Sequence, residues 1–205
     1  GKTFLSAFDV RVVNPKRCLF IVHRGLIARN SLKSFRQIID PHITMGLYTS
    51  GAKNVDADYI FATVQTLNQE ENLHAFAPDT FDYIIVDEAH HAGANTYQKI
   101  LKYFRPKFLL GMTATPERTD GYDIFKDFNY NIAYEIRLNQ ALSENMLVPF
   151  HYHGVSEITV NGELLDDHAD FNRLVSEERV KHILHFADFY GCDQGRVKGI
   201  VFCSR

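Results

Sequence analysis

The sequence predicts an α/β fold with a mostly parallel sheet and helices on both faces of that sheet. Short apolar runs alternate with helical patterns along most of the 205 residues. The run Tyr83–Val86 contains no charged residue and is rich in β-branched side chains, which is typical of a strand buried on both faces. Strands interleaved with helices form βαβ units, and these units pair their strands in parallel.

Six short, mostly apolar runs are the candidate strands. They are Cys18–Val22, Ile43–Tyr48, Tyr59–Thr63, Tyr83–Val86, Phe108–Met112 and Ile200–Cys203. Helical patterns cover residues 4–10, 26–39 and 177–189. The pattern at 26–39 places apolar side chains on one face, namely Leu32, Phe35 and Ile39. Basic side chains lie along another face of the same helix, namely Arg29, Lys33 and Arg36. The pattern at 177–189 forms one apolar stripe of Val180, Ile183, Leu184 and Ala187.

The alternation of strands and helices predicts three parts of the chain. Residues 1–140 form the first domain, in which the alternation is regular. Residues 141–176 form a linker, with His151–Thr159 as an extended crossing segment. Residues 177–205 begin a second domain, because the strand at Ile200–Cys203 has no partner strand after it in this sequence.

Composition predicts a cytoplasmic protein with no membrane span. No apolar run reaches the length of a transmembrane helix, and no basic-then-apolar secretory leader is present. The three cysteines are odd in number and far apart, which favours reduced, buried thiols over a disulfide framework or a zinc site. The formal net charge is only −3, yet seven basic residues and no acid lie between Asp9 and Asp40. A localised basic surface is therefore expected.

Polar residues follow four of the candidate strands at the point where each strand ends. These residues are His23-Arg24, Thr63–Thr66, Asp87–His90 and Thr113–Thr115. The carboxyl ends of parallel strands meet at one edge of a sheet, where ligands of α/β proteins bind. Two carboxylates at such an edge are costly unless a cation or a reaction uses them. Asp87 and Glu88 therefore predict a metal–phosphate site, although a helix N-cap with a solvated neighbour is the plainer alternative.

The first three residues match the end of a phosphate loop. Gly1-Lys2-Thr3 precedes a helical pattern, as does the end of the motif G-x-x-x-x-G-K-[ST]. The strand and the first glycine of that motif are expected upstream of residue 1.

In their order, these segments resemble the motifs of superfamily 2 helicases. Motifs I, Ia, Ib, II, III and the start of IV correspond to Gly1–Thr3, Val22–Arg24, Thr63–Thr66, Asp87–His90, Thr113–Thr115 and Ile200–Ser204. The Asp-Glu-Ala-His form of motif II and the run Gly111–Arg118 are most similar to the type III restriction-like (ResIII) branch of bacterial helicases. The resemblance implies a RecA-like P-loop NTPase domain followed by the beginning of a second one. It also implies an ATP hydrolase whose hydrolysis is coupled to movement on nucleic acid, with DNA favoured over RNA.

The resemblance further implies the roles of individual residues toward ATP and Mg²⁺. Gly1 allows close approach of the backbone to phosphate, and Lys2 contacts the β- and γ-phosphates. Thr3 and Asp87 hold Mg²⁺. Glu88 orients or deprotonates the attacking water, while His90, Thr113 and Thr115 couple this site to the nucleic-acid face. These parts suit phosphoryl transfer, which depends on positioning and charge neutralisation.

The nucleic-acid backbone is expected to contact His23, Arg24, Gln65 and Thr66. Arg29, Lys33 and Arg36 either extend that contact or form a solvated helix face. The later motifs of the second domain, with their arginines, are absent from the sequence, so this segment alone is expected to be inactive. A zinc site at His90-His91 or His151/His153 is disfavoured, because neither pair has a third ligand in a zinc-binding spacing.

A second function fits the same motifs. The chain is then part of an ATP-gated translocation or scaffold subunit of a restriction or nuclease complex that does not separate strands. In that case a nuclease domain or subunit lies outside this segment.

Overall fold

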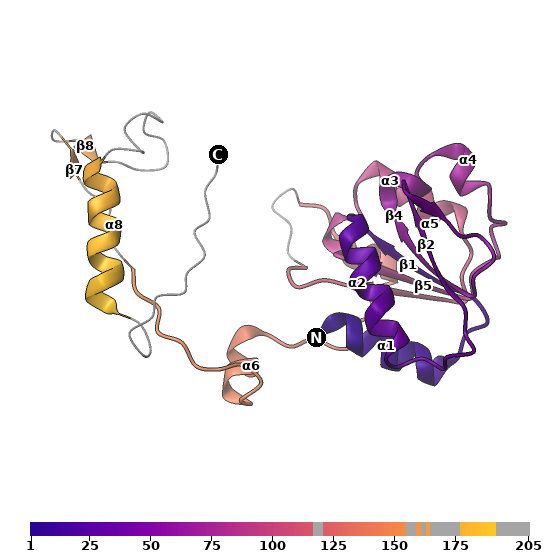
Figure 1. Cartoon of the computed structure of the whole chain (residues 1–205), viewed down its shortest axis with the longest axis horizontal. Coiled ribbons are helices and arrows are strands. Elements are labelled where there is room, and N and C mark those ends of the chain that lie inside the picture. Colours follow the sequence, from indigo (N-terminus) through magenta and orange to yellow (C-terminus); the bar gives the residue numbers. More distant parts are fainter. Residues whose placement is uncertain (117–120, 155–158, 161–162, 165–176, 192–205) are drawn as a thin grey trace. The chain divides into compact units, whose positions relative to one another are not determined.

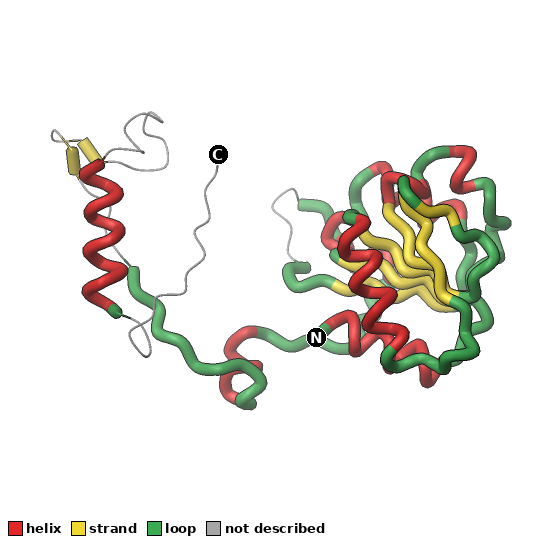
Figure 2. Tube along the Cα trace, in the orientation of Figure 1, coloured by secondary structure: helices red, strands yellow, loops and turns green. Residues whose placement is uncertain are grey.

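The computed structural model describes residues 1–116, 121–154, 159–160, 163–164 and 177–191 (Figures 1 and 2). The chain divides into two compact units, Gly1–Glu135 and Ile136–Arg205. The first unit ends close to the predicted domain boundary at residue 140. The predicted linker at 141–176 and the predicted start of a second domain at 177–205 both fall in the second unit and stay predictions.

The first unit contains a six-stranded sheet in the order β3-β2-β4-β1-β5-β6. Its strands are β1 (Cys18–Val22), β2 (Met45–Thr49), β3 (Ala52–Lys53), β4 (Tyr59–Thr63), β5 (Tyr83–Asp87) and β6 (Phe108–Met112). All pairings are parallel except that of β2 with the short β3. The predicted α/β fold with a mostly parallel sheet is therefore confirmed.

Helices cover both faces of this sheet (Figure 1). They are α1 (Lys2–Val13), α2 (Gly25–Arg36), α3 (Val64–Leu67), α4 (Glu70–Leu73) and α5 (Asn95–Tyr103), with 3₁₀ turns η1 (Ala89–His91) and η2 (Ile124–Phe128). One core cluster joins α1 and α2 to the sheet, and a second joins α3, α4 and α5 to its other face.

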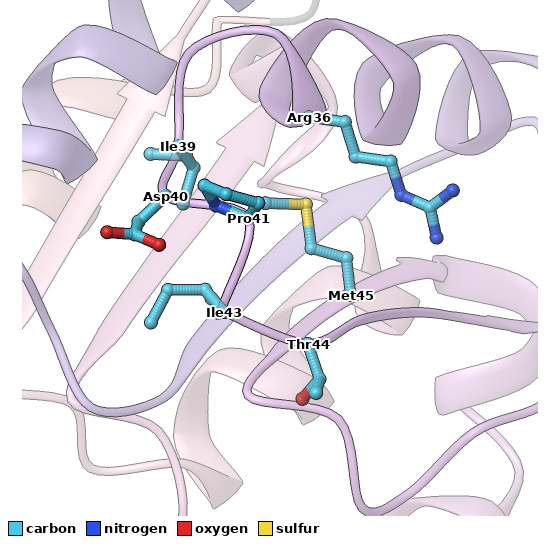
Figure 3. Close-up of a pocket in the computed structure, with 7 residues that line it drawn as sticks. All are labelled: Arg36, Ile39, Asp40, Pro41, Ile43, Thr44 and Met45. Atoms are coloured by element: carbon cyan, nitrogen blue, oxygen red, sulfur yellow. The ribbon is translucent and has the colours of Figure 1, made fainter.

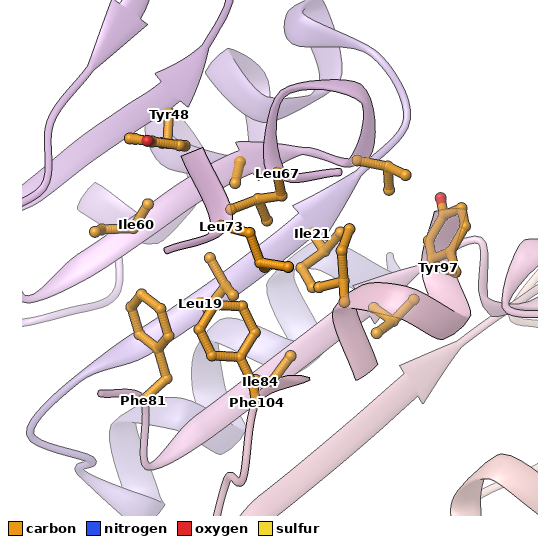
Figure 4. Close-up of a cluster of buried hydrophobic side chains, with 14 of the residues drawn as sticks. Leu19, Ile21, Tyr48, Ile60, Leu67, Leu73, Phe81, Ile84, Tyr97 and Phe104 are labelled. Carbon is orange, nitrogen blue, oxygen red and sulfur yellow. The ribbon is translucent and has the colours of Figure 1, made fainter. Parts of the chain in front are cut away.

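The central strand β1 shows why its sequence is continuously apolar. All five of its residues are buried. Phe20 and Val22 pack in the cluster that contains α1 and α2, whereas Leu19 and Ile21 pack in the cluster that contains α3 and α5 (Figure 4). Because successive side chains of a strand point to opposite faces, a strand covered on both sides needs apolar residues at every position.

The strand register aligns the carboxyl ends of the strands that carry the predicted site. Val22 of β1 lies opposite Thr63 of β4, and Ile21 lies opposite Val86 of β5. Asp87 lies opposite Met112 at the end of β6. The residues that follow these strands therefore share one edge of the sheet.

A hollow of about 430 Å³ lies at the other edge, between the end of α2 and the start of β2 (Figure 3). Most of the residues that line it are apolar, and they span Arg36 to Met45. Since β2 begins at Met45, this hollow lies at the amino ends of the parallel strands and contains none of the predicted nucleotide-binding residues.

The second unit contains α6 (Leu138–Ser143), the antiparallel pair β7 (Thr159–Val160) and β8 (Glu163–Leu164), and α8 (Glu177–Tyr190). The helical pattern at 177–189 is confirmed by α8, and its side chains Val180, Ile183 and Leu184 are exposed. The predicted strand at 200–203 lies outside the described residues, as do Arg118, Cys192 and Cys203. Among the described helices, none has the length and hydrophobicity needed to cross a membrane.

Candidate active site

The acid pair stands where β5 ends and the chain turns sharply. Asp87 is the last residue of β5 and is 8% exposed. Its Oδ1 accepts the backbone N–H of Glu88 at 3.1 Å. Glu88 has a φ of 53°, in the left-handed region that non-glycine residues seldom adopt, and η1 begins at Ala89. This turn keeps both carboxylates at the edge of the sheet.

The electrostatics of Asp87 favour a cation beside it. Burial, and then the neighbouring Glu88 carboxylate, raise the pKa of Asp87, against smaller opposing effects of the hydrogen bond from the Glu88 backbone N–H and of Lys2 and His23. An ionised, buried carboxylate of this kind is stabilised when a positive charge approaches it. A divalent cation supplies that charge, and a carboxylate oxygen is the type of ligand that Mg²⁺ prefers.

Lys2, near the start of the first unit, contacts the acid pair although the two are distant in the sequence. Its Nζ lies 3.3 Å from Oε1 of Glu88, and both side chains are only partly exposed. Lys2 opens α1, which has Gly1 at its N-cap, no side-chain cap and no acidic residue in its first turn. The first turn of such a helix attracts anions through its free N–H groups and the helix dipole. The amine and this helix start together fit a phosphate group next to Glu88.

His90 connects Glu88 to the strand end that carries Thr113. Its Nδ1 lies 3.3 Å from Oε2 of Glu88 and 3.0 Å from Oγ1 of Thr113. The same ring nitrogen therefore contacts both Glu88 and Thr113. The backbone N–H of Thr115 donates to the same Thr113 hydroxyl at 3.1 Å. The structure thus brings together Lys2, Glu88, His90, Thr113 and Thr115, which sequence reasoning had assigned to one site.

The four residues predicted to contact nucleic acid differ in exposure. Arg24 and Gln65 are exposed, and His23 is half-buried. The His23 ring lies 6.0 Å from the ring of His91, and its Nδ1 has no partner among the residues that the structure describes. Thr66 is only 5% exposed, and its hydroxyl lies 2.8 Å from that of Thr63. Its side chain therefore shapes the turn that exposes Gln65.

Sequence reasoning missed the buried residue that holds this turn. Asn72 is 3% exposed, and its Nδ2 donates to the carbonyl oxygen of Thr66 at 2.9 Å. Its Oδ1 accepts from Nζ of Lys53 at 2.6 Å. No sequence signal separates such an asparagine from a surface one.

Sequence reasoning also missed α5, the helix that follows the acid pair. Tyr97 of α5 is 4% exposed, and burial, followed by the charges of Asp87 and Glu88, raises its pKa to about 12. Its apolar face could have been found from the helical spacing of Tyr97, Ile100 and Phe104. This helix therefore packs within electrostatic reach of the acid pair.

Comparisons with known proteins match the part of the chain that carries this site. The family model of the type III restriction enzyme res subunit, ResIII, matches residues 1–118. The type I restriction enzyme EcoAI endonuclease subunit of Escherichia coli is 28% identical over 237 residues, covering 100% of this chain and 28% of that protein. A putative ATP-dependent helicase of Saccharomyces cerevisiae, IRC3, is 35% identical over 113 residues, covering 51% of this chain and 16% of that protein.

The fold also matches a solved structure. The Hef helicase domain of Pyrococcus furiosus superposes with a TM-score of 0.54 at 21% identity, covering 63% of this chain and 31% of that one. This likeness shows the RecA-like fold. The chain spans 28% and 16% of the two relatives named above, so it corresponds to a part of each. With the family model matching more than half of its length, the chain belongs to the ResIII family.

Proposed function

We propose that the protein is an ATP-dependent helicase or translocase in which hydrolysis drives movement along DNA. The observation that carries this proposal is the contact of the Lys2 amine with Glu88, next to the buried carboxylate of Asp87. These residues lie far apart in sequence and meet at the carboxyl edge of a parallel sheet. A cation, two carboxylates and a helix N-terminus are the parts that nucleotide hydrolysis needs.

Each of these groups has a separate task in the proposed reaction. Lys2 and the first turn of α1 would bind the phosphates, and Thr3 and Asp87 would hold Mg²⁺. Bound Mg²⁺ supplies charge that offsets the negative charge of the phosphates. Glu88 orients a water for attack on the γ-phosphorus and accepts its proton as the bond to the β-phosphate oxygen breaks. His90 holds the Glu88 carboxylate from its other side.

The test is ATP hydrolysis by the full-length protein without nucleic acid and with single-stranded DNA, duplex DNA or RNA. We expect hydrolysis that requires Mg²⁺ and is stimulated by DNA more than by RNA. Hydrolysis that no nucleic acid stimulates would contradict the proposal.

The second candidate is a translocating or scaffold subunit of a nuclease complex that does not separate strands. The relative from Escherichia coli, which is named as an endonuclease subunit of a restriction enzyme, favours it. The two candidates share the chemistry above and differ in the fate of the duplex. A duplex-displacement assay run beside a translocation assay distinguishes them, since movement without displacement supports the second.

The predicted contact of Arg24 and Gln65 with nucleic acid leads to a testable expectation for the neighbouring helix α2. This helix starts at Gly25, at the edge that carries the acid pair, and ends at Arg36, which lines the hollow at the opposite edge. Arg29 is exposed and lies in the first half of the helix, five residues after Arg24. We therefore expect Arg29→Glu to weaken DNA binding and to flatten the slope of log K against log salt by about 0.7–0.9.

Arg36→Glu is the matched control, because it reverses the same charge on the same helix. Binding titrations at several salt concentrations should leave its slope at the wild-type value. Equal slopes for both variants would assign Arg29 to a solvated surface.

A separate prediction concerns the hydroxyl group of Thr113. Thr113→Val keeps the shape of the side chain and removes the contacts of its hydroxyl with His90 Nδ1 and with the backbone N–H of Thr115. We expect DNA-stimulated turnover to fall about 5- to 10-fold, the effect of losing 1 kcal/mol or slightly more, while ATP binding is unchanged. Thr80→Val, in the loop before β5, is the control. Steady-state turnover with and without DNA checks the expectation, and equal loss in both conditions would show that the contact has no part in coupling.

A further inference from the structure

Two successive residues of α5 bind two other segments at the functional edge of the sheet. The helix directly follows the loop that carries Glu88 and His90, and Tyr97 in its first turn packs close to the acid pair. The next residues, Gln98 and Lys99, donate hydrogen bonds in different directions. Neither Gln98 nor Lys99 is among the groups assigned above to ATP.

Gln98 connects the acid-bearing loop to the segment that follows Thr113–Thr115. Its Nε2 lies 3.0 Å from the carbonyl oxygen of Ala92 in the loop. The same nitrogen lies 3.1 Å from the Tyr122 hydroxyl and 3.1 Å from Oδ1 of Asp127. Tyr122 in turn donates to Oδ2 of Asp127 at 3.0 Å.

The Tyr122 ring also packs directly on this loop. A Cβ added at Gly93 would lie 2.6 Å from Cδ1 of Tyr122, so the ring occupies space that only glycine leaves open. The hydroxyl of the same ring is fixed by Gln98 and Asp127. The loop is thus held by the hydrogen bond from Gln98 to its backbone and by the Tyr122 ring that packs on Gly93.

Lys99 connects the same helix to the turn that exposes Gln65. Its Nζ donates to the carbonyl oxygen of Asn68, the residue that follows α3, at 2.8 Å. It also forms an ion pair with Oε1 of Glu70 at 2.7 Å, and this pair lowers the pKa of Glu70. Because α3 contains Gln65, a displacement of that turn would move the oxygen atoms of Asn68 and Glu70 that Lys99 contacts.

We propose that α5 is the connection through which nucleic acid at the Gln65 turn stimulates ATP hydrolysis, with Gln98 and Lys99 as its positioning residues. The inference rests on the proposed function. The Lys99 side chain is 34% exposed and its partner Glu70 is 68% exposed, so this pair contributes little to folding. Its acceptors lie on segments of the functional edge, which suits a role in coupling better than a role in the core.

The experiment uses Gln98→Met and Lys99→Met in the full-length protein, with Lys102→Met as the control on the exposed side of the same helix. Basal kcat, the KM for ATP and DNA-stimulated kcat are measured for each. We expect the ratio of stimulated to basal kcat to fall about 5- to 10-fold in both test variants, which is the low end of a typical coupling effect. Basal kcat and KM should stay within about two-fold of wild type, and Lys102→Met should match wild type.

Lys99→Arg should recover part of the stimulation, because it keeps the charge that faces Glu70. Two outcomes would overturn the inference. One is a stimulation ratio in Gln98→Met and Lys99→Met equal to that of Lys102→Met. The other is an equal fall of basal and stimulated kcat together with a lower melting temperature, which assigns both residues to folding alone. A wild-type protein that DNA does not stimulate refutes the proposed function instead.

Discussion

Glu88→Gln should reduce ATP hydrolysis by the full-length protein by about 10²- to 10⁴-fold, the usual contribution of a general base. Glutamine keeps the length and shape of the side chain but cannot accept a proton from water. In the structure, Oε1 of Glu88 lies 3.3 Å from Nζ of Lys2 and Oε2 lies 3.3 Å from Nδ1 of His90, so both carboxylate oxygens have a partner at the site.

Nucleotide binding should survive this change, since Lys2 and the start of α1 remain. The measurements are single-turnover hydrolysis with saturating ATP and binding of a fluorescent ATP analogue. Glu71→Gln, an exposed acid in α4, is the matched control and should hydrolyse ATP at the wild-type rate. A Glu88→Gln protein with unchanged DNA-stimulated turnover would show that another group activates the water.

Asp87→Asn should have opposite effects on activity and on stability. Hydrolysis should fall by about 10²-fold or more, because a metal ion contributes several kcal/mol of charge stabilisation and asparagine is a poorer Mg²⁺ ligand. The amide oxygen of asparagine can still accept the N–H of Glu88, so the turn after β5 is preserved. Activity measured over a range of Mg²⁺ concentrations should show a weaker response to the metal than in wild type.

The stability of the same variant follows from the raised pKa of Asp87, which burial and Glu88 cause. The protonated carboxyl is favoured in the folded protein. Its contribution to the free energy of unfolding is therefore complete below the pKa of the unfolded state and is lost as the pH rises through the pKa of the folded state. At neutral pH, in the absence of Mg²⁺, the neutral asparagine should therefore raise the melting temperature. The difference should shrink as the pH is lowered and also when Mg²⁺ and nucleotide are added to the wild type.

Asp79→Asn, at an exposed position of the loop before β5, is the matched control for the same change of side chain. A lower melting temperature for Asp87→Asn at neutral pH would contradict the electrostatic reading. It would mean that the ionised carboxylate is already stabilised in the nucleotide-free protein.

The strand pattern of the first unit could be predicted because both faces of the sheet are covered. A strand such as Cys18–Val22 must then be apolar at every position, and that requirement is visible in the sequence. The helix at Gly25–Arg36 was predicted slightly too long, up to residue 39. Ile39 remains buried, but it lies in the turn that leads to Asp40-Pro41, where proline disfavours helix.

The candidate site could be predicted only as far as its residue types and strand ends allow. Asp87 and Glu88 stand out because carboxylates after a buried strand are unusual. Thr66 carried the same kind of signal, yet its hydroxyl bonds to Thr63 inside the turn. Gln98 and Lys99 had no signal, since a glutamine and a lysine on a helix are ordinary surface residues until their partners are known.

The parallel sheet and the edge at which the acid pair lies could be predicted from the residue pattern, because hydrophobic periodicity is local and strand ends follow from it. Which side chains meet at that edge became visible only in the folded chain. The contact between Lys2 and Glu88, and the bonds from α5 to Asn68 and Asp127, join residues that are distant in the chain. Such contacts depend on the packing of whole elements, which no local pattern encodes.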